Sequence, residues 1–238
     1  GAKGEVPASS FRFTHTAAAN SYVIIDVVAP GVGISAVSYD GVTLTPLAAT
    51  YLNNIPATGA YNRYGVVNNE AGTKSIGIAL TGYGAVSACS VSYYGVKTVG
   101  ATTTMYATGV PLLSQHVDAW EYGGQMIVHG FAADQMAPEW ALGGGTPRYG
   151  VSFSSSGGAW YGDVEISDSL TSTTFEAAAT IGNASGIATV LTGVLGTPAQ
   201  SSRTGATDLY LRIGSSAPGA VSATTTNPSL SAIPIPAT

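Results

Sequence analysis

The sequence predicts an all-β protein: an antiparallel β-sandwich, jelly-roll-like, with an extended C-terminal arm. Three observations support this prediction. Apolar and polar residues alternate with a period of two along most of the chain, which is the pattern of half-buried strands. Turn signals recur about every 8–12 residues, the spacing found in sandwiches and jelly rolls. Only 9% of the residues are charged, so the charged faces that surface helices need are missing.

The composition is compatible with one large β domain. Hydrophobic residues make up 45% of the 238 residues, which is enough for a core without disulfides or a bound metal. All-β sandwiches often exceed two hundred residues as a single domain. We expect a lead-in at residues 1–9, one β-sandwich over residues 10–197 and the arm over residues 198–238.

The clearest strand signals lie in the first half of the chain. Residues 22–29 form a nearly continuous apolar run, which is typical of a central strand. Residues 34–39 and 42–47 alternate on either side of Asp40-Gly41, a strong signal for a two-residue hairpin turn. Pro46 predicts that the return strand lies at a sheet edge or ends there. Further strands are expected at residues 11–16, 61–67, 73–80 and 85–94.

In the second half, residues 125–133 predict a strand, and residues 148–154 and 160–166 predict a hairpin. Residues 99–115, rich in Thr, Ala and Gly, are interpreted as a crossing connection. A short helix is expected near residues 112–119. No repeat of fixed period is visible. The remaining expected strands are residues 172–179 and 186–195.

The C-terminal forty residues differ in character from the sandwich. They are poor in core residues, and proline at every second position near the end removes the donors that a sheet interior requires. We therefore expect an extended arm, ordered either by the sandwich of its own chain or by a neighbouring subunit. The apolar residues expected to anchor this arm are Leu209, Tyr210, Leu211, Ile233 and Ile235.

The chain resembles a β-sandwich domain of tailed-bacteriophage virion proteins, especially the minor tail proteins of phages of mycobacteria. The resemblance lies in residues 13–16, in the apolar strand at residues 22–28 and in residues 36–46, which read Ala-Val-Ser-Tyr-Asp-Gly-Val-Thr-Leu-Thr-Pro. This stretch is similar to the family's Val-Ser-Tyr-Gly-Gly-Val-x-Leu-Thr hairpin, with Asp40-Gly41 in place of Gly-Gly. Further matching pieces are residues 63–67, 72–76 and 91–96. The resemblance covers residues 10–197 and is firmer in the first half.

This resemblance implies a non-enzymatic structural protein of the virion, assembled in the host cytoplasm. A minor tail or appendage protein, with a role in host attachment, is the first expectation. A capsid decoration protein is an alternative, and a carbohydrate-binding module for cell-envelope glycans is another. The expected partners are copies of the same chain and other virion proteins. A trimer would suit an appendage, although the sequence does not set the number of copies.

Charge and hydropathy indicate which classes of binding partner the chain is expected to have. The net charge is −5 and no basic run occurs, so nucleic acid is not an expected partner. No apolar stretch approaches the ~20 residues that a membrane-spanning helix needs. A chain with so few charges tends to associate, which favours a subunit buried among its copies. The alternative is a monomer covered by Ser and Thr hydroxyls.

No residue pattern indicates a catalytic site, a cofactor or a metal. Asp163, Glu165 and Asp168 lie close together, but two carboxylates on one strand face are more often a solvated edge than a glycosidase pair or a calcium site. His129 stands in an apolar strand and is interpreted as a sheet histidine with satisfied hydrogen bonds. Cys89, the single cysteine, is interpreted as a buried structural thiol.

Aromatic residues in the second half suggest one binding site. Trp140 lies in a Pro- and Gly-rich loop beside Glu139, and Tyr149 follows in the next strand. Aromatic rings can stack on the apolar faces of sugars while neighbouring polar groups bind hydroxyls. These three residues are therefore the candidate glycan site. The alternative is that the aromatics mark a subunit interface.

Overall fold

The computed structural model confirms an all-β protein. The described residues form nineteen strands and two short 3-10 turns, η1 (Leu52–Asn54) and η2 (Pro56–Thr58), but no α-helix. No helix among these residues is long and apolar enough to cross a membrane. The structure describes residues 2–4, 8–110, 112–118, 124–134, 142–143, 146–153, 157–166, 172–178, 182–193, 201–203 and 209–210.

The strands form four sheets. Sheet A has the order β19-β18-β9-β3-β7-β6, with β1 also paired to β9; sheet B has the order β2-β8-β4-β5. Sheet C is β10-β17-β12-β15-β14, and sheet D is β11-β16-β13. The bounds in sheet A are β1 Ala2–Gly4, β3 Ser21–Pro30, β6 Pro46–Tyr51, β7 Gly59–Asn68, β9 Ser87–Tyr94, β18 Ser201–Arg203 and β19 Leu209–Tyr210. Those in sheet B are β2 Ala8–Ala17, β4 Ile34–Tyr39, β5 Val42–Thr43 and β8 Gly72–Gly84. Those in sheet C are β10 Val96–Thr108, β12 Gln125–Ala133, β14 Thr146–Phe153, β15 Gly157–Ile166 and β17 Asn183–Gly193. Those in sheet D are β11 Leu112–Asp118, β13 Leu142–Gly143 and β16 Ser172–Ala178.

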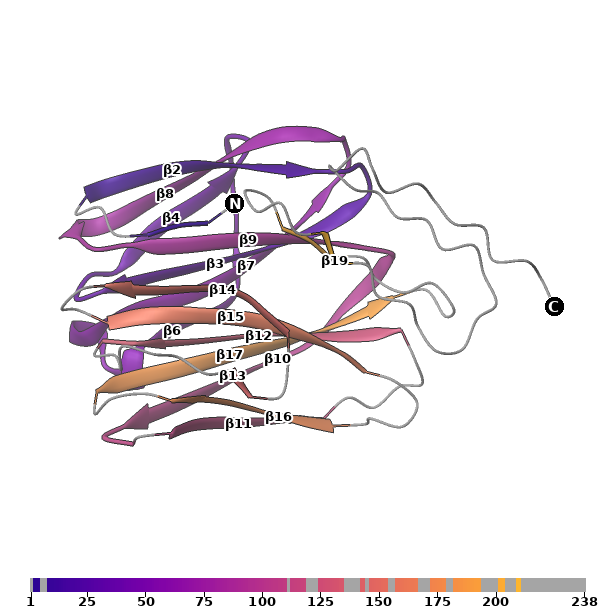
Figure 1. Ribbon diagram of the computed structural model, residues 1–238. Helices are drawn as coiled ribbons and strands as arrows, with labels where there is room; N and C mark the ends of the chain where they lie inside the picture. The colour runs from indigo at the N-terminus through magenta and orange to yellow at the C-terminus, as the bar shows by residue number, and fades with distance from the viewer. Residues whose placement is uncertain are drawn as a thin grey trace.

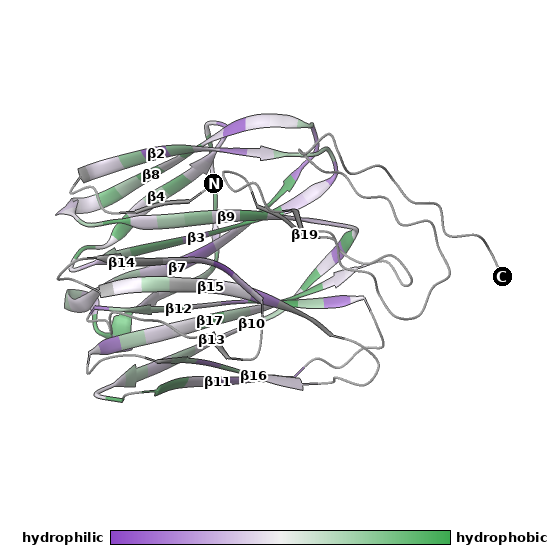
Figure 2. Ribbon diagram, in the orientation of Figure 1, coloured by the Kyte–Doolittle hydropathy of each residue, from purple (hydrophilic) through white to green (hydrophobic). Residues whose placement is uncertain are grey.

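The sheets stack in four layers in the order B, A, C and D (Figure 1). Figure 2 shows hydrophobic residues along strands of all four layers. One buried apolar cluster lies between sheets A and B and a second between sheets C and D. Two further clusters join sheet A to sheet C. The central strands of the two middle sheets, such as β3 and β12, are therefore buried on both faces.

Each half of the chain is a jelly roll. In the first half, β1, β9, β3 and β7 adjoin in one sheet, and β2, β8, β4 and β5 in the other. The last strand, β9, therefore lies between the first strand, β1, and the third strand, β3. This is the strand order of a jelly roll, which consists of two Greek keys. The second half repeats this order, with β10, β17, β12 and β15 in one sheet and β11, β16 and β13 in the other. The strands expected as one sandwich over residues 10–197 are thus distributed over two.

The two jelly rolls are related reciprocally. Gly95, with a φ of 71°, is the single residue between β9 and β10 and therefore between the halves. Strand β6 lies against β10, and β1 lies against β14. By position in the jelly roll, β1 of the first half corresponds to β10 of the second, and β6 corresponds to β14. The contact between β6 and β10 is therefore the counterpart of the contact between β14 and β1. The arrangement approximates that of a twofold-symmetric dimer built from one chain.

Several elements follow the sequence prediction. Strand β3 lies between β7 and β9 at the centre of sheet A, and nearly all its residues are buried. Asp40 and Gly41 both have positive φ, 50° and 82°, as a primed hairpin turn between β4 and β5 requires. Pro46 begins β6, the edge strand of sheet A. The expected return strand is divided, because β5 stays in sheet B while β6 crosses to sheet A.

Two sequence predictions are wrong. Residues 99–115, expected to be a connection, belong mainly to β10 and β11. The helix expected near residues 112–119 is instead strand β11, in which Leu113, Gln115 and Val117 are buried and their neighbours are exposed. This alternation has the period of a strand, and threonines in β10 suit a half-exposed ladder.

Candidate functional site

The predicted glycan residues are only partly within the described chain. Trp140 and Glu139 lie outside the described residues. Tyr149 lies on β14 and is half-buried, with its ring stacked on Tyr161 at a centroid distance of 6.0 Å and an interplanar angle of 9°. Tyr161 in turn meets Tyr61 of sheet A edge-on, with the centroids 6.3 Å apart. Tyr149 therefore belongs to a stack of rings between sheets C and A.

The predicted arm residues are also divided. Leu209 and Tyr210 form β19, which pairs with β18, and β18 pairs with β9 of the same chain. Leu211, Ile233 and Ile235 lie outside the described residues. The beginning of the arm thus adds two strands to sheet A, the first of the two places that the sequence left open for it.

The solvated edge expected at Asp163 is wrong. The side chain of Asp163 is fully buried and forms a two-point ion pair with Arg148: Nε donates to Oδ2 and Nη2 to Oδ1, each at 2.8 Å. Glu165 pairs through its backbone with Met126. The side chain of Glu165 and the whole of Asp168 lie outside the described part of the chain. Alternation on a strand reveals that one face is buried, and in β15 that face carries the carboxylate.

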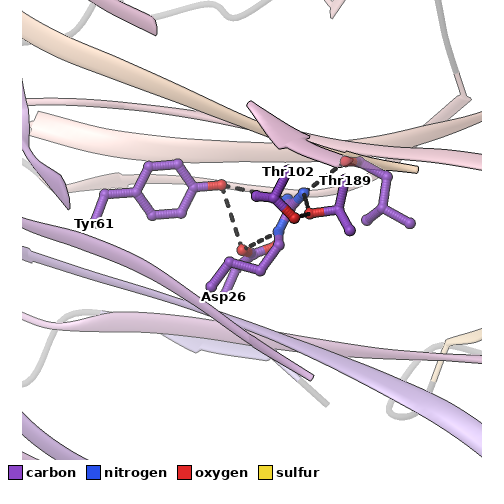
Figure 3. Close-up of polar contacts among 6 residues, drawn as sticks. Asp26, Tyr61, Thr102 and Thr189 are labelled. Atoms are coloured by element: carbon purple, nitrogen blue, oxygen red, sulfur yellow. Dashed lines mark hydrogen bonds and ion pairs between the residues drawn. The ribbon is translucent and has the colours of Figure 1, made fainter. Parts of the chain in front are cut away.

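The most distinctive feature of the structure is a buried polar network between sheets A and C. In sheet A, Arg63 on β7 donates from Nε to Oδ1 of Asp26 at 2.7 Å and from Nη2 to Oδ2 at 2.9 Å. Its Nη1 crosses to sheet C and donates to the carbonyl oxygen of Val128 at 2.6 Å and to Oγ1 of Thr189 at 3.3 Å (Figure 3). The hydroxyl of Tyr61 approaches Oδ1 of Asp26 at 3.4 Å. One guanidinium therefore joins a carboxylate of its own sheet to the backbone of the opposite sheet.

The second jelly roll makes the reciprocal connection. The Arg148–Asp163 pair lies in sheet C, and the hydroxyl of Tyr93 in sheet A donates to Oδ2 of Asp163 at 3.0 Å. Each middle sheet therefore carries one internal Arg–Asp pair, and each pair is hydrogen-bonded across the interface. Arg63 and Asp163 are 0% exposed, and Asp26 and Arg148 are 2% exposed.

Burial and charge compensation set the protonation of this network. Burial alone would lower the pKa of Arg63, but the carboxylate of Asp26 raises it above its ordinary value. Burial, reinforced by the charge of Asp163, raises the pKa of the Tyr93 hydroxyl well above its ordinary value. Arg63 is therefore charged and the Tyr93 hydroxyl is neutral. Asp26 and Asp163 each lie beside a guanidinium and a hydroxyl donor. Two-point pairing of this kind compensates the desolvation of buried charges.

Two histidines are buried inside the jelly rolls. His15 on β2 reaches sheet A, where its Nε2 lies 2.7 Å from Oγ of Ser92 and its Nδ1 lies 2.8 Å from Oγ of Ser90. Burial lowers the pKa of His15 to about 3. Nε2 of His129 lies 3.2 Å from Oε1 of Gln115, but its buried Nδ1 has no hydrogen-bond partner among the described residues, so the expectation of a fully satisfied histidine is wrong. Burial, followed by the charge of Arg63, lowers the pKa of His129 well below its ordinary value. Both rings are therefore neutral and act as cross-sheet polar contacts.

The single thiol is also buried. Burial, followed by the charge of Asp26, raises the pKa of Cys89 well above its ordinary value. A protonated, inaccessible thiol is a poor nucleophile, which agrees with the structural interpretation of Cys89. Among the described residues, no group of three His, Cys, Asp or Glu side chains is placed to hold a metal.

Sequence reasoning missed the network, although it left a signal. Asp26 is the only charged residue in the apolar run of residues 22–29, and Arg63 stands inside the expected strand at residues 61–67. A charge in a strand predicted to be buried requires a partner of opposite charge, and Arg63 on another expected strand could have been proposed as that partner. Comparison with family models, curated proteins and solved structures finds no match for the chain.

Proposed function

We propose that this chain is a non-enzymatic structural protein of a tailed-bacteriophage particle, located in the tail or one of its appendages. One observation carries the proposal: two jelly rolls lie face to face in a single four-layer body, and a buried Arg–Asp pair in each middle sheet is hydrogen-bonded to the other sheet. Separating the halves would break these buried hydrogen bonds and expose the apolar clusters between sheets A and C. A stiff body made from one chain suits a component that bears load at a particle surface. Jelly rolls serve in viral capsids and in lectins, and the resemblance of residues 36–46 to virion tail domains favours the phage particle.

The distribution of charge supports a subunit packed among other subunits. The chain has only 21 Lys, Arg, Asp and Glu side chains, eight basic and 13 acidic. Four of these charged side chains are buried between sheets A and C and do not contribute to the surface: Asp26, Arg63, Arg148 and Asp163. The outer strands instead carry hydroxyls, such as the exposed threonines of β10. We infer that partners are further copies of the chain and other virion proteins, assembled in the host cytoplasm.

Labelling of particles tests the proposal. An antibody raised against the purified chain should label intact tailed phage from a lysate in which the sequence is expressed, viewed by electron microscopy with gold. Antibody pre-absorbed with the chain serves as the control. Gold on the tail or an appendage supports the proposal, and gold on the head supports the capsid-decoration alternative. Chain found only in the particle-free fraction would contradict both.

The expected role of the arm in assembly has its own test. Deleting residues 199–238 should lower the molar mass of assemblies formed in solution, measured by light scattering after size exclusion. An unchanged molar mass would show that the arm does not join subunits.

A further inference from the structure

The two jelly rolls differ at one equivalent edge. In the second unit the first strand, β10, spans Val96–Thr108 and pairs with β17 from Gly193 to Asn183. In the first unit the corresponding strand, β1, has only three residues and pairs with Ser87–Cys89 of β9. The described residues of β1 therefore cover a shorter stretch of β9 than β10 covers of β17.

The C-terminal segment pairs with the stretch of β9 beyond β1. Strand β18 pairs antiparallel with the next stretch of β9, with Ser201 opposite Tyr93, Ser202 opposite Ser92 and Arg203 opposite Val91. Strand β1 also runs antiparallel to β9. The two short strands consequently run in the same direction along one edge of β9. Of the β9 residues, only Ser90 separates the stretch paired with β1 from the stretch paired with β18. Together they occupy the position that β10 occupies alone.

This edge binds its segment through the backbone. A strand added to a sheet edge is held mainly by main-chain hydrogen bonds, and the same bonds form whichever chain supplies the strand. The segment is joined to β17 by residues 194–200, which can span up to ~26 Å when extended. Release of β18 therefore does not require β17 to move. Exchange of an identical element between copies is a low-cost route to association.

We propose that the β9 edge at Val91–Tyr93 is a strand-acceptor site for the segment Ser201–Arg203, donated in an assembly by a second copy of the chain. The donation between copies rests on the assembly role proposed above, whereas the acceptor site does not. In an isolated chain the segment of the same chain occupies the site. In an assembly each arm completes the first jelly roll of a neighbour.

Hydrogen exchange in the full-length chain tests the acceptor site. Prolines at Ser201 and Ser202 remove two successive donors, and one of any two successive amides in a strand faces the neighbouring strand. In the S201P/S202P variant, the β9 amides that face β18 should exchange at least about tenfold faster than in the wild type. The matched control S215P/S216P carries the same change further along the arm and should leave β9 unaffected. Equal protection of β9 in S201P/S202P and wild type would overturn the site, because another segment would then cover the edge.

Addition of donors in trans tests the exchange between copies. A synthetic peptide of residues 197–213 should restore the protection of β9 in S201P/S202P in a dose-dependent way, and failure to restore it would overturn the site. Next, unlabelled wild-type chain is mixed with isotopically heavy S201P/S202P, and protection is read on the heavy β9 fragment alone. Protection supports donation by a second copy. Protection by the peptide without protection by the wild-type chain would overturn that donation. These results are independent of the particle labelling that tests the proposed function.

Discussion

Arg63 and Val128 lie on different jelly rolls, and Nη1 of Arg63 donates a hydrogen bond to the carbonyl oxygen of Val128 at 2.6 Å. The same guanidinium is held by both oxygens of Asp26. The charge that stabilises one strand pair of sheet A therefore also determines how sheet A sits on sheet C. The Tyr93–Asp163 hydrogen bond makes the equivalent connection in the opposite direction.

Replacing Arg63 should destabilise the whole chain. We expect Arg63→Met to lower the free energy of unfolding by ~3–5 kcal/mol, because Asp26 is left buried without its cation. Urea unfolding followed by tryptophan fluorescence and circular dichroism measures the change. The double variant Asp26→Leu with Arg63→Met should recover much of the loss, because no unpaired charge remains.

The matched control for Arg63 is a pair at the surface. Lys74 lies 2.9 Å from Asp40, and their side chains are 21% and 54% exposed. Exposed pairs contribute ~1 kcal/mol or less, so Lys74→Met should have a small effect. Similar losses in Arg63→Met and Lys74→Met would contradict the assignment of Arg63 as the cross-sheet contact.

Acid should destabilise the first jelly roll through His15. Its folded pKa of about 3 lies below the ordinary value of 6.5, so the unfolded chain binds a proton that the folded chain does not. Stability is complete above about pH 6.5 and is lost as the pH falls toward about 3, with a slope of at most ~1.4 kcal/mol per pH unit for this residue.

The His15→Gln variant should show a shallower loss of stability over this pH range, measured by urea unfolding at each pH. His129 has the same sign of shift and leaves a residual slope. His116→Gln, at a histidine whose side chain is 58% exposed, is measured beside it as a control for the substitution itself. An unchanged slope in His15→Gln would show that this ring does not govern the acid response.

Gly186 lies in the second jelly roll at a position where neighbouring side chains leave no room for a Cβ atom. A Cβ added there would lie 2.8 Å from both Oε1 of Gln115 and Cγ of Met105, and 2.9 Å from Cδ1 of Phe131. We expect Gly186→Ala to lower the free energy of unfolding by ~1–3 kcal/mol. At Gly82 the nearest atom to an added Cβ is Cγ1 of Val32 at 3.8 Å, so Gly82→Ala should be nearly neutral. Thermal unfolding of both variants compares the sites, and equal midpoints would exclude crowding at Gly186.

The carbohydrate-binding alternative makes a separate prediction for Trp140. If the chain attaches to envelope glycans through this loop, Trp140→Ala should abolish the signals that the wild type gives on a glycan array. Tyr149→Ala is a less selective probe, because Tyr149 stacks on Tyr161 between the sheets and its loss also affects packing. Absence of binding by the wild type, or equal binding by wild type and Trp140→Ala, would remove this alternative.

Local features of the fold were predictable because they depend on neighbouring residues. The apolar run of β3 indicates burial on both faces, Asp40-Gly41 suits positive φ at both turn positions, and Pro46 excludes a central position for β6. Residues 99–115 were misread because threonine- and glycine-rich segments occur in both connections and half-exposed strands. The candidate site was less predictable: Asp163 stood out as a carboxylate, but its burial and its pairing with Arg148 did not.

The sequence by itself determined an antiparallel β protein with a central apolar strand and a primed hairpin, since periodicity and turn chemistry act within a few residues. Only the tertiary structure decided that the strands form two jelly rolls, that Arg63 reaches Val128 and that Ser201–Arg203 lies on β9. Alternation of apolar and polar residues shows that one face of a strand is buried, but it does not show which sheet covers that face. Ladder hydrogen bonds join backbone groups that every residue except proline carries, so pairing between distant strands leaves little trace in the sequence.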